Sequence, residues 1–207
     1  MLLLNLIIIL LVGGGLAWWS ERLGSNWPRF ISVLVVLADL GYLLFNLSSI
    51  PMEQFSLVPA AGDPSSWLVA YQVDWIPRFG ISFQLAMDGL SLILVLLTLV
   101  LGWVAIISSW NEKNDRQGFF QANILWVLAG VIGVFLAMDL FLFFLFWEVM
   151  LVPMYLLIAI WGHEGKAYAS MKFFIFTQLS GLLMLVAILV LAKLHHTATG
   201  VYSFSYF

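Results

Sequence analysis

The sequence has no cysteine and few charged residues. The lack of cysteine among the 207 residues excludes disulfides, cysteine-ligated zinc, thiolate-held iron–sulfur clusters and cysteine nucleophiles. Charged residues make up 9% of the chain, about a third of the share that is typical of soluble domains. With 8 Lys and Arg residues and a net charge of −3, the chain has no basic surface suited to nucleic acid.

Apolar residues take the place of the missing charge. They make up 63% of the chain, and the mean hydropathy is +1.06. A soluble fold of this length could not bury so much apolar surface. The composition therefore predicts an all-α membrane protein with several spans in the lipid bilayer.

Six apolar runs are long enough to cross a bilayer, for which a helix needs about 20 residues. They cover residues 2–19, 30–48, 83–108, 119–137, 141–161 and 170–194, each with approximate bounds. None has the alternating pattern of a membrane β-strand. We expect one transmembrane domain over residues 1–207, built as a bundle of six helices.

One long connection, residues 49–82, separates the second and third runs. Its alternating segment 69–75 predicts a short strand or hairpin. The basic residues predict its side of the membrane, because cytoplasmic loops are rich in Lys and Arg. Three connections on one side hold Arg22, Arg29, Lys113, Arg116, Lys166 and Lys172, whereas the opposite side holds Arg78 and Lys193. The N-terminus and the long loop are therefore expected outside.

Glu148 is the strongest candidate for a functional residue. It lies within the apolar run 141–153, where no neighbour in sequence can neutralise it. An ionisable residue at the centre of a membrane helix costs roughly 2.5–3.5 kcal/mol and is a functional hypothesis by default. A carboxyl in this position suits a group that loads and releases protons. The structural alternative is a protonated Glu that bonds to a neighbouring helix.

Other polar residues in or near the spans have simpler explanations. Asp39 is either a buried partner or a residue facing a wet crevice. Asp88 and Asp139 stand where helices are expected to begin, and a capping role is favoured for both. Lys172 can extend to the membrane surface, and Gln178 is expected to bond to another helix. Asp139, Lys172 and Gln178 are kept as supporting candidates beside Glu148.

Five segments resemble one known family. They are Trp75–Ser82, Asp88–Ser91, Phe141–Met154, Trp161–His163 and Lys172–Ile175. They are similar to the antiporter-like membrane subunits, of the M or chain 4 type, of bacterial proton-pumping NADH–quinone oxidoreductase (respiratory complex I). The resemblance extends over essentially the whole chain, and the segment around Trp147 and Glu148 is its most specific part.

The resemblance implies a translocase subunit that carries out no redox chemistry. Flavin, iron–sulfur clusters, NADH and quinone belong to other subunits of such a complex, so no cofactor or metal is expected in this chain. The partners would be other membrane-arm subunits, and the location would be the bacterial inner (plasma) membrane. Glu148 matches the family's fifth-helix Glu, the central proton carrier. Glu112 also falls where relatives carry Glu.

Members of the family have two inverted repeats and many more helices than six. The chain is therefore expected to be the N-terminal part of a longer subunit. Two alternatives remain open: a subunit of an Mrp-type cation/proton antiporter, which shares the fold, and a truncated scaffold that moves no protons.

Overall fold

The computed structural model describes residues 1–48, 67–111 and 115–205. Within them, six helices are long and apolar enough to cross a membrane. These are α1 (Leu2–Ser20), α2 (Trp27–Leu47), α3 (Gly89–Ser108), α4 (Gln117–Leu136), α5 (Leu140–Trp161) and α6 (Lys166–Thr199). The predicted class, an all-α membrane protein with six spanning helices, is confirmed.

The start of the third predicted span is wrong. Residues 83–87 are apolar but belong to strand β2 (Ile81–Met87), and α3 begins only at Gly89. Asp88 separates the two elements, because its carboxylate accepts a hydrogen bond from the Ser91 N–H at 2.7 Å. The Ser91 hydroxyl in turn accepts one from the Asp88 N–H at 2.8 Å. This capping box fixes the first turn of α3 and confirms the capping role expected of Asp88.

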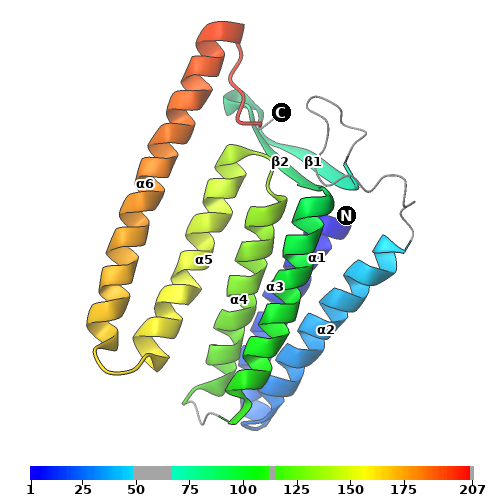
Figure 1. Cartoon of the computed structure of the whole chain (residues 1–207), viewed down its shortest axis with the longest axis vertical. Helices are drawn as coiled ribbons and strands as arrows, with labels where there is room; N and C mark the ends of the chain where they lie inside the picture. Colours follow the sequence, from blue (N-terminus) through cyan, green and yellow to red (C-terminus); the bar gives the residue numbers. More distant parts are fainter. Residues whose placement is uncertain (49–66, 112–114, 206–207) are drawn as a thin grey trace.

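The hairpin expected between the second and third helices is present. Strand β1 (Val69–Ile76) pairs antiparallel with β2, and the register shifts between Asp74 and Ile76. The hairpin lies across the end of the bundle at which α1 begins (Figure 1). The rest of the expected outer loop, residues 49–66, lies outside the described residues, as does Glu112.

The helices form a compact group with one protruding member. α1 packs on α2 and α4, α3 packs on α2 and α4, and α5 connects α4 to α6. Figure 1 shows α6 at the margin of the bundle, beside α5. In the most apolar window of α4, 56% of the residues are buried, against 11% in α6. α6 therefore contributes one narrow face to the fold, and that face meets α5.

α6 is also longer than expected. Its 34 residues exceed the predicted span 170–194 at both ends and correspond to about 50 Å of helix. This is more than the roughly 30 Å of a hydrocarbon core. After Gly200 the chain returns toward the hairpin, where the Leu140 N–H donates to the Phe204 carbonyl at 2.9 Å.

Candidate proton site between α5 and α6

Glu148 lies on α5, eight residues after Leu140, or about 12 Å along the helix axis. Its side chain is half-buried and is directed toward α6. The Gln178 side-chain amide donates a hydrogen bond from Nε2 to Glu148 Oε2 at 2.8 Å. The structure thus brings together two of the candidate residues, and it confirms the bond between helices that was expected of Gln178.

Gly181 makes room for this contact. It stands one turn after Gln178 on the same face of α6 and is buried. A Cβ atom placed at this position would overlap Glu148 Oε1. Any side chain at position 181 would therefore push the carboxyl away from α6. Gln178 and Gly181 together form a notch that holds Glu148.

The two carboxyl oxygens have different surroundings. Oε2 accepts the bond from Gln178, whereas Oε1 is buried and has no hydrogen-bond partner among the described residues. Buried polar atoms are nearly always paired in stable structures. A single unpaired oxygen in a helix interface provides a position at which a proton can be bound and given up.

The two ends of the interface between α5 and α6 differ in character. On the hairpin side of Glu148, an apolar cluster fills the space, with Phe141, Phe144, Ile188 and Phe204 among its members. On the other side, the rings of Tyr155 and Phe174 lie 5.4 Å apart, and the Thr177 hydroxyl donates to the Phe173 carbonyl at 2.7 Å. Glu148 therefore lies between an apolar cluster and a region that contains hydroxyl groups.

Asp139 is separate from this site. It is fully buried at the start of α5, and its carboxylate accepts bonds from the N–H groups of Ser82, Phe141 and Leu142 at 3.0, 2.9 and 3.1 Å. The capping role is confirmed, and the bond from Ser82 adds a tie to the hairpin that the sequence did not indicate. Nine residues, or about 13 Å of helix, separate Asp139 from Glu148.

Lys172 does not contact Glu148 either. Its side chain is exposed, and its ammonium nitrogen lies 5.8 Å from the centre of the Tyr168 ring. Six residues, or about 9 Å of helix, separate it from Gln178. This position near the end of α6 agrees with a side chain that extends to the membrane surface.

Gly181 is the residue of the site that sequence reasoning missed. The signal was its spacing from Gln178, since residues three apart share a helix face. Glycine is common in membrane helices, so its presence in the sequence does not by itself indicate a site. Only the position of Glu148 on the facing helix gives this one a role.

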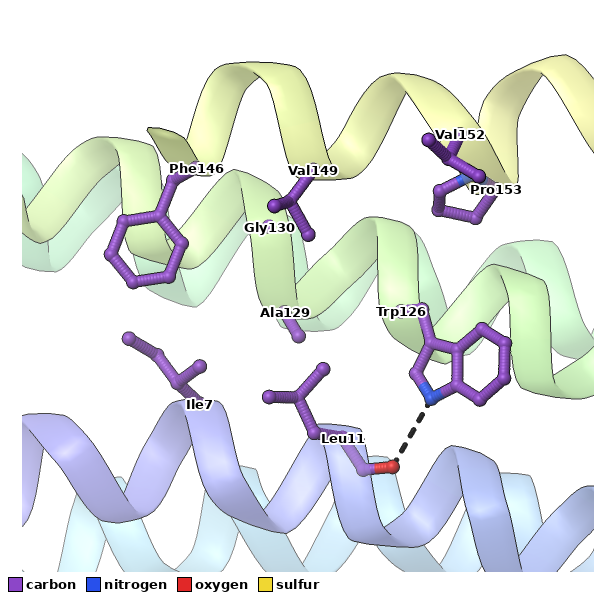
Figure 2. A pocket seen from close by; sticks show the side chains of 9 residues that line it. All are labelled: Ile7, Leu11, Trp126, Ala129, Gly130, Phe146, Val149, Val152 and Pro153. Atoms are coloured by element: carbon purple, nitrogen blue, oxygen red, sulfur yellow. Dashed lines mark hydrogen bonds between the residues drawn. The ribbon is translucent and has the colours of Figure 1, made fainter. Parts of the chain in front are cut away.

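A separate apolar pocket lies on another face of α5. Its volume is about 370 Å³, and Val149 and Pro153 of α5 face Leu11 of α1 and Trp126 of α4 across it (Figure 2). The Trp126 indole N–H donates to the Leu11 carbonyl at 3.1 Å. None of the nine lining residues is ionisable, so the pocket offers no group that could carry a proton. Among the described residues no group of three potential metal ligands occurs.

One family model matches part of the chain. Residues 137–206 match a family model described as NADH:quinone oxidoreductase/Mrp antiporter, transmembrane. That segment contains the whole of α5 and α6, and therefore Glu148, Gln178 and Gly181.

Several curated relatives match the whole chain, two of which are described here. NADH-quinone oxidoreductase subunit M of Escherichia coli strain K12 is 51% identical over 211 residues, and the match covers 41% of that protein. The protein of the same name from Pseudomonas aeruginosa is 52% identical over 212 residues, again with 41% covered. A chain of respiratory complex I from Thermus thermophilus superimposes with a TM-score of 0.74 at 25% identity, over 99% of this chain and 38% of that chain. The chain is thus similar along its entire length to subunit M of NADH-quinone oxidoreductases, and it spans about two fifths of the length of those proteins.

Proposed function

We propose that this chain carries part of a proton path through the membrane, with Glu148 as the group that binds the proton. The observation behind the proposal is the notch on α6. There Glu148 Oε2 is held by Gln178, while Oε1 is buried and unpaired. An intramembrane carboxyl that is anchored by one oxygen and free at the other can gain and lose a proton without moving its backbone.

The process that drives the proton is the transfer of electrons from NADH to quinone in a complex of several subunits. The identity of 51% to subunit M of Escherichia coli supports this assignment. In the proposed complex the chain binds no cofactor, because flavin, iron–sulfur clusters, NADH and quinone are held by other subunits. Its contacts are with other membrane-arm subunits and with lipid, in the bacterial inner membrane.

The proposed orientation places the N-terminus and the hairpin outside the cell. Arg22, Arg29, Arg116, Lys166 and Lys172 lie near the ends of the helices that are opposite the hairpin. Only Arg78 and Lys193 lie toward the hairpin end of the described chain. Since positive residues favour the cytoplasmic side, the end with five basic residues faces the cytoplasm.

Exchange of protons for another cation, as in an Mrp antiporter, is the second candidate. The family model that matches residues 137–206 covers both classes of protein. The two functions differ in their driving force, and the scaffold interpretation differs from both in requiring no acid at position 148.

The experiment uses inverted membrane vesicles from cells whose native copy of the protein carries Glu148→Gln. We expect NADH to acidify vesicles of the parent strain and to cause no acidification beyond background in the variant, with the subunit still present in the membrane. Acidification that follows a sodium gradient but not NADH would favour the antiporter. Unchanged NADH-driven acidification in the variant would support the scaffold.

A further inference from the structure

Asp39 is a second buried carboxyl, remote in the fold from Glu148. It lies on α2, twelve residues from Trp27 and eight from Leu47, and is therefore near the middle of the span. Its side chain has no exposed surface. Both oxygens, Oδ1 and Oδ2, are buried and lack a hydrogen-bond partner among the described residues.

No cation is available to Asp39 from the neighbouring helices. α2 packs on α1, α3 and α4, and none of these three helices contains an Asp, Glu, Lys, Arg or His. The basic residue on α2 itself, Arg29, lies ten residues away, or about 15 Å of helix. Its guanidinium donates to the Gln117 side-chain oxygen at 3.4 Å. The short turn that leads into α2 holds Glu21 and Arg22, farther still from Asp39.

The tyrosine one turn after Asp39 on α2 does not bond to its carboxyl. The Tyr42 hydroxyl, one turn away, accepts a hydrogen bond from the Asn5 amide at 2.9 Å. Val36 and Leu43, which share the inward face of α2 with Asp39, are fully buried. Asp39 thus lies in a buried apolar layer, and no described residue bonds to its carboxyl.

An ionised carboxylate in such a layer would be an isolated charge, with a large free-energy cost, and a group in this position takes up a proton instead. We propose that Asp39 is a second site at which this chain binds a proton inside the membrane, separate from Glu148. Asp39 lies on α2, which packs on α1, α3 and α4, whereas Glu148 lies at the interface of α5 and α6. The proposal does not depend on the function assigned to Glu148.

Infrared spectroscopy of the purified native complex tests the proposal, after growth on aspartate labelled with ¹³C at the side-chain carboxyl. The label shifts the carbonyl band of protonated aspartate and separates it from that of protonated glutamate. We expect a protonated-aspartate band in the parent that loses intensity in Asp39→Asn. The band should be unchanged in Asp74→Asn, which alters an exposed residue of β1, and in Glu148→Gln.

Two results would overturn the proposal: a parent complex without any protonated-aspartate band, or a band of equal intensity in Asp39→Asn. If Asp39→Asn does not accumulate, Asp39→Glu replaces it. The band should then be lost from aspartate and gained by glutamate, and its retention by aspartate would contradict the proposal. The Glu148 hypothesis is tested by proton pumping, and the Asp39 proposal by the infrared band. Since Glu148→Gln is expected to keep the band, either idea can fail without the other.

Discussion

At the scale of single residues, the site depends on three side-chain positions. Glu148 supplies the acid, Gln178 fixes one of its oxygens, and Gly181 leaves the space for it. A hydrogen bond to a charged group contributes about 1.5–3 kcal/mol, and the partial exposure of Glu148 lowers that figure. The hydrogen bond from Gln178 and the space left by Gly181 both act on the position of the carboxyl.

Gly181→Ala is expected to impair proton transfer even though alanine favours helices by about 1 kcal/mol over glycine. The added methyl group would displace Glu148 from Gln178. Gly41→Ala is the matched control, because Gly41 lies in α2 with nothing within 4 Å of an added Cβ. Protons moved per NADH oxidised should fall several-fold in the first variant and stay at the parent value in the second. Equal values in both would contradict the role of the notch.

Gln178→Leu keeps the approximate volume of the side chain but removes the donor to Glu148. We expect a several-fold loss of pumping, smaller than that caused by Glu148→Gln, because the acid itself remains. Gln72→Leu, in the exposed part of β1, serves as control. A Gln178→Leu variant that pumps like the parent would show that the bond does not position the acid.

At the scale of elements, Asp139 connects the first turn of α5 to the hairpin. Its carboxylate serves three backbone N–H groups, from Ser82, Phe141 and Leu142. The paired backbone of Asp139 and Ser205 brings in the segment after α6 as well. The first turn of α5, the hairpin and the segment after α6 therefore meet at Asp139.

Asp139→Ala should therefore destabilise the protein, by about 1–3 kcal/mol, since it removes a cap and leaves buried donors unpaired. The temperature of half-inactivation of the purified complex is the measurement. Asp74→Ala, an exposed aspartate of the same hairpin, should leave that temperature unchanged. An equal effect of the two substitutions would contradict the capping role.

The sequence predicts the presence of the six helices better than the residues at which they begin and end. Apolar runs such as 119–137 identify the spans because a run of this length can cross the bilayer. In lipid its backbone N–H and C=O groups must bond to one another, which a helix achieves. Residues 83–87 show the limit of this reasoning. They are as apolar as a span, but their pairing with β1 is a contact between segments that composition does not encode. The position of Gly181 opposite Glu148 was hidden for the same reason, whereas Glu148 itself stands out in any apolar run.

At the scale of the whole molecule, the helices differ in how much of their surface the rest of the bundle buries. α4 is the most buried of the six spans, and α6 the least. The chain spans about two fifths of the length of the curated relatives it matches. Glu148 and Gln178 lie between α5 and α6, the two least buried helices.

The proposed orientation of the whole molecule can be tested because the sequence has no cysteine. Gln72→Cys places one thiol on the hairpin, and Glu164→Cys places one in the turn between α5 and α6, both at exposed positions. A membrane-impermeant maleimide should label the first thiol in intact spheroplasts and the second only in inverted vesicles. The reverse pattern would show that the N-terminus faces the cytoplasm.

The central claim is that the acid at position 148 carries the proton. The most direct measurement is the ratio of protons moved to NADH oxidised, in inverted vesicles of Glu148→Gln and of Glu164→Gln. The second variant makes the same chemical change at an exposed residue. We expect a ratio near zero for Glu148→Gln and the parent ratio for Glu164→Gln. A parent ratio in Glu148→Gln would contradict the claim.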